Sequence, residues 1–278
     1  MGGQITRSHS LRTITRSVAT ARHRLRRYAA GGLLAMPLLI AQCDPGCEPP
    51  GPRIIETRQV GTSIRGRPIT AYRLGTPGGK VVLAVGSIHG DEQAGIEIVE
   101  HLRDSAAIPA GFDVWIIPTI NPDGNVIDYE TNAAGVDLNR NFPVNWQPID
   151  CVAIPLNCAG PSPLSEPESQ SAADFLTEIQ PRVTVWYHAV GSVVDRATQD
   201  GVADPAVLTA YAREVGYAVT TVSCGPGGCT GNATQFQNAT FAGTSAFVVE
   251  LSTRTAGAMS PTGVANHTEG FWAAAAEG

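Results

Sequence analysis

Two residues with metal-binding side chains, His89 and Glu92, stand three positions apart in the stretch Ser-Ile-His-Gly-Asp-Glu. An imidazole and a carboxylate at this spacing can turn toward one point and bind one borderline metal ion such as Zn²⁺. The pair by itself is common, and a polar loop that caps the following helix would explain it as well. A metal site therefore needs support from residues elsewhere in the chain.

Apolar runs along the chain show where that support comes from. The run at residues 81–85 is rich in β-branched residues, which predicts a buried strand of a parallel sheet just before His89. Open α/β sheets hold their ligand sites past the carboxyl ends of such strands. Three further apolar runs also lead into residues with useful chemistry, namely 114–118 before Asn-Pro-Asp-Gly, 183–187 before His188, and 246–249 before Glu250.

Two of the four histidines beyond residue 42, His89 and His188, follow such strands. Two histidines and a carboxylate form the ligand set of hydrolytic zinc sites, in which the fourth position stays open for water. A further glutamate beside that water can take its proton and deliver it to a leaving amine. Glu250 lies among apolar neighbours, where a charged carboxylate is costly. It must therefore pair with another group, bind a metal ion or have a raised pKa. The sequence therefore predicts a metal site.

Two polar stretches complete the pattern. Asn-Pro-Asp-Gly at residues 121–124 predicts a turn. The run at residues 135–143 places one aspartate, two asparagines and one arginine within five positions. These groups are costly to bury, so we expect them to line a site and not to belong to the core.

The remaining pattern predicts the elements that position these residues. Residues 60–69 predict a hairpin with glycines in its turn. Residues 93–103 predict a helix, because Ile96, Val99 and Leu102 recur at helical spacing as a buried stripe. No linker or repeat interrupts the chain beyond residue 54, so we expect one domain.

Charge and composition divide the chain into three parts. Residues 1–42 hold seven arginines and no acidic residue, and the other 12 basic and 25 acidic residues give the remainder a net charge of −13. This acidity excludes nucleic-acid binding through phosphate neutralisation. We expect a leader over residues 1–42, a linker rich in proline and glycine over 43–53, and one α/β domain over 54–278.

The arginine-rich start has the pattern of an export signal. It leads into an apolar segment, residues 29–41, that is too short and too rich in glycine for a stable membrane span. Arg26-Arg27 resembles a twin-arginine signal. The stretch ending at Cys43 resembles a bacterial lipoprotein site, although Gln42 stands where a small residue is normal. We expect export; a lipid anchor at Cys43 and a cytoplasmic protein with an unusual tail are the alternatives.

The six cysteines fall into three close pairs, Cys43/Cys47, Cys151/Cys158 and Cys224/Cys229. Spacing does not choose among the possible pairings. Bridges between near neighbours that close surface loops are the simplest arrangement in an oxidising compartment. A cysteine zinc site is the alternative, but no Cys-x₂-Cys spacing supports it.

Together the motifs resemble those of the zinc metallocarboxypeptidases, and within them the short bacterial murein peptide amidases. The resemblance covers residues 61–251 in the family's order: His-Gly-Asp-Glu at 89–92, Asn-Pro-Asp-Gly at 121–124, Gly-Val-Asp-Leu-Asn-Arg-Asn-Phe-Pro at 135–143, Tyr-His at 187–188, Gly-Asn-Ala-Thr-Gln-Phe-Gln-Asn at 231–238 and Phe-Val-Val-Glu-Leu at 247–251. The combination of motifs in this order is highly specific.

The resemblance implies a fold and a metal. The fold is a mixed, mostly parallel twisted sheet of about eight strands flanked by helices. One Zn²⁺ per chain would be held by His89, Glu92 and His188. Asp137 would be the outer partner that fixes the imidazole of His89.

The resemblance also implies a reaction. Asn139 and Arg140 would bind the terminal carboxylate of a substrate, and Glu250 would be the general base and then the general acid. For an exported protein the implied substrate is a peptide of the bacterial cell wall, cut beside diaminopimelate. We expect a monomer that binds this peptide, no nucleic acid, and a membrane only through an anchor at Cys43.

Two other functions remain open. A deacylase related to the aspartoacylases would share a His-Gly-x-Glu and an Asp-Leu-Asn-Arg motif. The Asn-Pro-Asp-Gly stretch and Asn141-Phe142 argue against it. A degenerate, non-catalytic domain that binds the cell wall is the second alternative.

One position departs from the family pattern. Its members usually carry an arginine between Asn-Pro-Asp-Gly and Gly-Val-Asp-Leu-Asn-Arg, where it steadies the oxyanion formed when water attacks. Residues 125–134 contain no arginine, and Glu130 takes its place. A carboxylate aimed at an oxyanion would repel it. Either Glu130 turns away, another arginine reaches in, or the domain is catalytically weak.

Overall fold

The computed structural model describes residues 54–104, 107–196, 202–225 and 227–278. The predicted leader and linker, the Cys43/Cys47 pair and the anchor site at Cys43 lie outside these residues and stay predictions. Within the described part, no helix combines the length and the apolar character that a membrane crossing requires.

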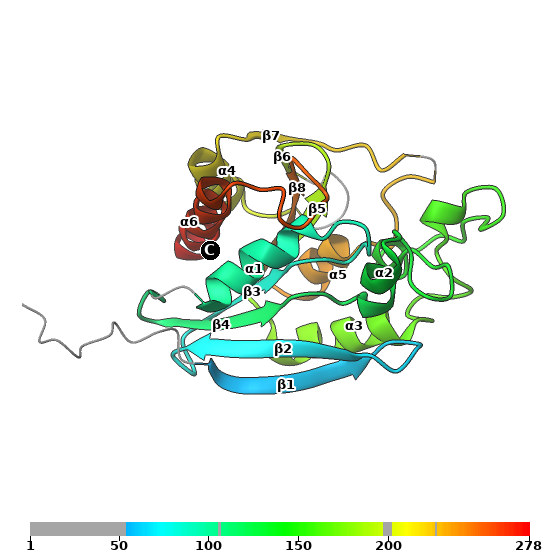
Figure 1. Cartoon of the computed structure of the whole chain (residues 1–278), viewed down its shortest axis with the longest axis horizontal. Coiled ribbons are helices and arrows are strands. Elements are labelled where there is room, and N and C mark those ends of the chain that lie inside the picture. Colours follow the sequence, from blue (N-terminus) through cyan, green and yellow to red (C-terminus); the bar gives the residue numbers. More distant parts are fainter. Residues whose placement is uncertain (1–53, 105–106, 197–201, 226) are drawn as a thin grey trace, which may run out of the picture. The chain divides into compact units, whose positions relative to one another are not determined.

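An eight-stranded mixed sheet organises the domain (Figure 1). The strands lie in the order β1-β2-β4-β3-β5-β8-β6-β7. Strands β4, β3, β5 and β8 are mutually parallel, β1 and β2 are antiparallel to their neighbours, and β6 is antiparallel to β8 but parallel to β7. The predicted mixed, mostly parallel sheet flanked by helices is therefore confirmed. From β1 to β8, the bounds are Ile54–Thr62, Pro68–Gly75, Lys80–Val85, Phe112–Ile117, Val183–Ala189, Val193–Asp195, Ala218–Thr220 and Ser245–Leu251.

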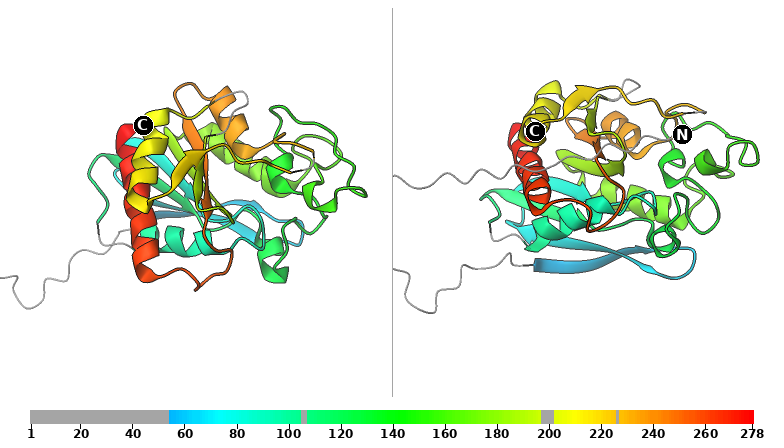
Figure 2. Two further views of the ribbon diagram at one scale, coloured as in Figure 1. Left: turned by 90° about the horizontal axis from the view of Figure 1, so that it is seen from above. Right: turned by 45° about the horizontal axis from the view of Figure 1, so that its top comes forward.

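The four apolar runs of the sequence are the four parallel strands β3, β4, β5 and β8. Strands covered on both faces read as continuous apolar runs because neither side meets water. Every residue of β5 is buried. Helices α1, α4 and α6 cover one face, and α3 and α5 cover the other; Figure 2 shows α4 and α6 side by side. Their bounds are Ala94–Asp104, Pro205–Val215, Pro261–Glu277, Pro167–Ile179 and Ala233–Thr240.

The predicted hairpin and the first helix are present, with corrections of detail. The hairpin is the β1–β2 pair, and Gly66 takes a left-handed φ of 80° in its turn. Helix α1 extends one residue beyond the predicted end. Its buried stripe contains Ile98, whereas Ile96 is only half-buried. Residues three positions apart on a helix are about 60° out of line around its axis. Two such steps separate Ile96 from Leu102, so Ile96 no longer lies on the buried face.

The Asn-Pro-Asp-Gly stretch opens a short helix, α2 (Pro122–Ile127), so the prediction of a simple turn was wrong. The side chain of Asn121 caps this helix by accepting a hydrogen bond from the N–H of Gly124 at 3.0 Å, and Pro122 occupies the first helical position. Asparagine and proline favour both turns and helix starts, because each satisfies or removes a backbone donor. The sequence alone therefore does not separate these two outcomes.

Candidate metal centre

Two neighbouring strands and one loop bring the predicted ligands together. His89 and Glu92 lie just past the carboxyl end of β3, and His188 lies near the end of β5, the strand next to β3. On the far side of β5, Glu250 of β8 pairs in register with His188. Residues paired in this way project from the same face of a sheet, so the carboxylate of Glu250 lies beside the histidine.

The loop that carries His89 rests directly on α2. A Cβ on Gly90 would lie 2.2 Å from the carbonyl carbon of Gly124 and 2.3 Å from the oxygen of Tyr129, so only glycine fits there. The N–H of Gly90 donates to the carbonyl of Glu130 at 3.1 Å, and its carbonyl accepts from the side chain of Asn125 at 2.9 Å. The Asn-Pro-Asp-Gly motif thus supports the ligand loop, a role that its sequence did not reveal.

The three predicted ligands have distances that suit one zinc ion. The Nδ1 atoms of His89 and His188 each lie 3.1 Å from Oε2 of Glu92, and all three side chains are buried. Two ligand atoms at about 2.0–2.1 Å from a tetrahedral zinc lie roughly 3.3–3.4 Å apart. The donor set and its spacing therefore fit the metal that the fold implies.

The charges in this cluster keep the carboxylate ionised. Burial alone would raise the pKa of Glu92, but the two imidazoles outweigh burial and lower it. Burial likewise opposes charge on His89, yet the carboxylates of Glu92 and Asp137 raise its pKa well above the usual value. A carboxylate that stays deprotonated is ready to bind a metal ion.

Asp137 lies where the sequence predicted, behind the ring of His89. Its Oδ1 is 3.1 Å from Nε2 of His89 and accepts the N–H of Asn139 at 2.8 Å. A carboxylate at the distal nitrogen fixes the tautomer and the direction of the ring. His89, Glu130 and Asp137 form a second possible metal cluster, but its Glu130 is only half-buried and its Asp137 already holds the ring of His89. The first cluster is therefore the better metal candidate.

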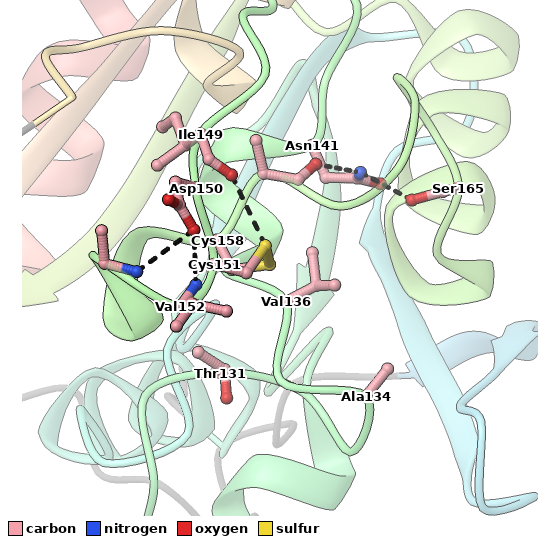
Figure 3. Close-up of a disulfide and its surroundings, with 12 residues drawn as sticks. Thr131, Ala134, Val136, Asn141, Ile149, Asp150, Cys151, Val152, Cys158 and Ser165 are labelled. Carbon is pink, nitrogen blue, oxygen red and sulfur yellow. Dashed lines mark hydrogen bonds between the residues drawn. A yellow bond between two sulfur atoms is a disulfide. The ribbon is translucent and has the colours of Figure 1, made fainter.

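The expectation that the polar side chains of residues 137–141 avoid burial was wrong for three of them. Asp137 and Asn141 are fully buried, and Arg140 is only 7% exposed. Asn141 is satisfied because its Nδ2 donates to the carbonyls of Ala159 and Ser162 and to the hydroxyl of Ser165, which Figure 3 shows in part. Partners that follow much later in the chain thus offset the cost of burial.

A cavity of about 190 Å³ adjoins the three ligands. Asn139 and Arg140 line it, as predicted for residues that bind substrate. The guanidinium of Arg140 donates to the carbonyls of Asn139 at 2.9 Å and Cys224 at 3.3 Å, while its Nε is buried without a partner. Oδ1 of Asn139 accepts the N–H of Ala233 at 3.1 Å, so the amide NH₂ is the group that it can offer to a ligand.

Glu250 also lines the cavity, and its environment favours the protonated form more than water does. Burial raises its pKa first, and the nearby carboxylates of Glu92 and Asp195 raise it further, against the opposing effect of the two histidines. A carboxyl with a raised pKa can accept a proton and then give it up near neutral pH. The site therefore combines a metal ligand set with a candidate acid–base group.

The missing arginine is not replaced within the cavity. Glu130 lines it, half-buried, and burial is the first cause of its raised pKa. Arg254 binds the carboxylate of Asp91 and lines a different cavity with Gln93. Among the described residues that line the metal cavity, Arg140 is the one arginine. Glu130 therefore does not turn away from the cavity, and no other described arginine reaches in.

Four of the cysteines form the two predicted near-neighbour disulfides, Cys151–Cys158 and Cys224–Cys229. Figure 3 shows the first, next to the buried side chain of Asn141. Both bridges adjoin the site, because the carbonyl of Cys158 accepts the N–H of Asp137 at 2.8 Å and the carbonyl of Cys224 accepts from Arg140. A cysteine zinc site is excluded for these four residues.

Several cavity residues escaped the sequence analysis. Asp195 ends the three-residue strand β6, Asn157 ends a short 3-10 helix (Pro155–Asn157), and residues 222–224 belong to a loop. None of them stands in a recognisable motif. The one available signal was that Asp195 directly follows two valines. A pattern this short does not predict on which face of a strand the aspartate lies.

Known proteins share both the sequence pattern and the fold. Murein peptide amidase A of Escherichia coli (strain K12) is 29% identical over 157 residues, which cover 53% of this chain and 62% of that protein. The structure of carboxypeptidase A from Helicoverpa armigera superposes with a TM-score of 0.67 at 20% identity, covering 80% of this chain and 69% of that one. The murein-tripeptide amidase of Escherichia coli O157 gives a TM-score of 0.56 at 22% identity, covering 78% and 90%.

These structural matches extend over most of the domain and show its fold. A family model described as zinc carboxypeptidase matches residues 50–260, more than half of the chain. Members of this family are zinc enzymes, and the His–Glu–His cluster gives this chain a matching candidate site. The chain belongs to the zinc carboxypeptidase family.

Proposed function

We propose that this protein is a zinc-dependent hydrolase that cleaves a peptide bond next to a free carboxylate. The proposal rests on one observation: a single small cavity joins the His–Glu–His cluster, the acid–base group Glu250 and the guanidinium of Arg140. One Zn²⁺ would be held by His89, Glu92 and His188. When bound, zinc would polarise the scissile carbonyl and lower the pKa of the attacking water.

The protein's own residues would carry the protons and hold the ligands. Glu250 would accept a proton from the attacking water and deliver it to the leaving amine, because its raised pKa suits both steps. Asp137 would keep Nδ1 of His89 directed at the metal by holding Nε2. These roles divide the five acidic and imidazole groups, His89, Glu92, Asp137, His188 and Glu250, between metal binding and proton transfer.

Arg140 and Asn139 would hold the substrate's terminal carboxylate. The Nε of Arg140 has no partner, and each terminal nitrogen keeps a second N–H besides the one that it donates to a carbonyl, so the guanidinium can bind two carboxylate oxygens in parallel. The NH₂ of Asn139 would donate a further hydrogen bond. With the carboxylate fixed, the neighbouring peptide bond would lie near Glu250, which lines the same cavity.

The substrate we propose is a peptide of the bacterial cell wall, cut beside diaminopimelate, and the protein acts as an exported monomer. The similarity to murein peptide amidase A supports the substrate. The two disulfides support an oxidising compartment. A lipid anchor at Cys43 is the alternative form of the exported protein.

A non-catalytic domain that binds cell-wall peptides is the second candidate. One observation favours it: a carboxylate, Glu130, lines the cavity where the family usually has an arginine. Turnover separates the two candidates, because both would bind zinc and peptide.

The reaction can be tested directly with the zinc-loaded protein and the peptide L-Ala-γ-D-Glu-diaminopimelate. We expect released diaminopimelate, measured by chromatography. Glu250→Gln should keep zinc and lower turnover by about 10²–10⁴-fold, because the amide carries no proton to the leaving group. Glu269→Gln, on the exposed side of α6, is the matched control. Undiminished turnover by zinc-loaded Glu250→Gln would contradict the mechanism.

The metal assignment predicts that His188→Ala weakens zinc binding by at least about 100-fold, since loss of an outer-shell partner alone typically costs 10–100-fold. Calorimetric titration with Zn²⁺ measures the affinity. His101→Ala, which removes an exposed imidazole of α1, should bind zinc like the parent protein. Equal affinity in both variants would place the metal elsewhere.

The carboxylate grip predicts a selective defect in Arg140→Lys. Because one ammonium cannot reproduce two parallel bonds, kcat/KM should fall by about tenfold or more for peptides with a free terminal carboxylate. For peptides amidated at that carboxylate, kcat/KM should fall much less. Arg58→Lys, whose exposed guanidinium binds Glu178, serves as the control. Equal losses on both peptides would show that another group binds the carboxylate.

The departure at Glu130 predicts that Glu130→Arg leaves zinc affinity unchanged and raises turnover on a wall peptide by roughly tenfold to 100-fold. The added donor would stabilise the oxyanion, where loss of one such donor typically costs about 10²–10³ in rate. Glu130→Gln removes the charge alone and should give a smaller gain. Lower turnover in both variants would mean that Glu130 has a positive role in binding or catalysis.

A further inference from the structure

The disulfide Cys224–Cys229 joins two segments that meet at Arg140. The carbonyl of Cys224 accepts hydrogen bonds from Nη2 of Arg140 at 3.3 Å and from Nδ2 of Asn157 at 3.4 Å. Ser223 and Cys224 also line the metal cavity together with Arg140. The bridge is therefore attached to a residue whose backbone holds the guanidinium in the cavity.

The Cys229 side of the bridge is anchored to the backbone around Arg140. The carbonyl of Cys229 accepts from the side chain of Gln235 on α5 at 2.9 Å. Two residues after Cys229, the carbonyl of Gly231 accepts the N–H of Phe142 at 2.8 Å, and a Cβ on Gly231 would lie 2.5 Å from the oxygen of Arg140. These contacts keep this segment beside Arg140 without help from the bridge.

The Cys224 side leads into a segment with much conformational freedom. Three of the four residues between the two cysteines are glycine. Gly225, Gly227 and Gly228 are exposed and take left-handed φ values of 68°, 93° and 77°. Because glycine loses more conformational freedom on ordering than any other residue, holding Cys224 in place is costly for this loop. The bridge lowers that cost, since it fixes the distance between the two ends of the loop.

The second disulfide, Cys151–Cys158, closes a loop of a different kind. Residues 152–157 contain no glycine. The segment after the bridge is held by other contacts, because the carbonyl of Ala159 accepts from the side chains of Asn141 at 2.8 Å and Trp146 at 3.1 Å. Opening this bridge would leave that segment in place, so the two disulfides provide an internal comparison.

We propose that Cys224 is a positioning residue for Arg140, and that its disulfide makes carboxylate binding depend on the redox state of the surroundings. The inference rests on the proposed function and adds regulation to the same site. A dithiol reductant opens the bridge by thiol–disulfide exchange: two electrons and two protons pass to Cys224 and Cys229, and the reductant becomes a disulfide. The carbonyl of Cys224 then leaves Arg140, and the guanidinium loses one of the two carbonyls that hold it.

The bridge is placed where a reductant can reach it and where the metal site is spared. Cys224 and Cys229 are both half-buried, and the glycines between them are exposed. The zinc ligands lie at the end of β5 and in the loop after β3, away from this disulfide in the chain. The reduced protein therefore keeps its metal site and binds carboxylates weakly. In an exported protein, the site would bind carboxylates well only after transfer to an oxidising compartment.

The first test compares two double variants as zinc-loaded full chains, using L-Ala-γ-D-Glu-diaminopimelate with a free and with an amidated terminal carboxylate. In Cys224→Ser/Cys229→Ser we expect KM for the free carboxylate to rise by about tenfold, since a hydrogen bond to a charged group is lost. The ratio of kcat/KM between the free and the amidated peptide should fall by a similar factor. Zinc affinity should match the parent protein, which also shows that the variant is folded. Cys151→Ser/Cys158→Ser is the matched control and should keep the ratio.

The second test titrates the parent protein with mixtures of reduced and oxidised dithiothreitol in a zinc-buffered solution. Alkylation and mass spectrometry report how far each bridge is open. The ratio of kcat/KM between the two peptides should fall along the curve for Cys224–Cys229 and return on reoxidation. A ratio that stays constant while this bridge opens, or that follows Cys151–Cys158 instead, would overturn the role of Cys224.

Binding measurements separate this inference from the proposed function. Calorimetry with zinc-loaded Glu250→Gln gives the affinity for both peptides in the oxidised and the reduced state. A preference for the free carboxylate that disappears on reduction, with no hydrolysis by the parent protein, would overturn the proposed reaction and support the redox role. Hydrolysis with the same preference in both redox states would overturn the redox role and leave the reaction intact.

Discussion

The carboxylate of Glu92, held between the Nδ1 atoms of His89 and His188, is the contact on which the rest of the site depends. A buried carboxylate without partners costs several kcal/mol or changes its protonation state. Here each imidazole lies 3.1 Å away and lowers the pKa of the acid. These contacts require the loop after β3 to meet the end of β5, which their neighbouring places in the sheet make possible.

The parallel centre of the sheet extends this constraint to Glu250, the candidate acid–base group. Since β8 is parallel to β5 and in register with it, the position of His188 also fixes that of Glu250. Helix α5 holds this pair of strands from one face: Gln237 binds Thr184 and Trp186 of β5 through its side chain. The buried hydrogen bonds therefore determine where the two chemical groups lie relative to each other, and the apolar core supplies most of the driving force for folding.

Local sequence patterns predicted the parallel strands and the metal cluster. The features that the sequence did not predict depend on contacts between segments that lie far apart in the chain. Strands β3, β4, β5 and β8 were visible because burial on both faces leaves a continuous apolar signal. The burial of Asn141 was not visible, because its partners lie at residues 159–165 and no local rule connects them. Asp195 was missed for a similar reason: a strand of three residues has no periodicity, and its place beside β8 follows from the sheet order alone. The roles of the site residues stay predictions.

Two acidic side chains that line the metal cavity affect its charge in the same way. Glu130 and Asp195 both add negative charge to a small space that holds one guanidinium and, in the proposed enzyme, one zinc ion. Negative charge beside a developing oxyanion raises the energy of the transition state, so Glu130 opposes the reaction if the substrate is neutral. For a substrate that brings its own cation, the same field increases the local concentration of substrate and offsets part of that penalty. An acidic lining would therefore favour a cationic peptide over a neutral one, and the absence of the arginine would then be connected with the charge of the substrate.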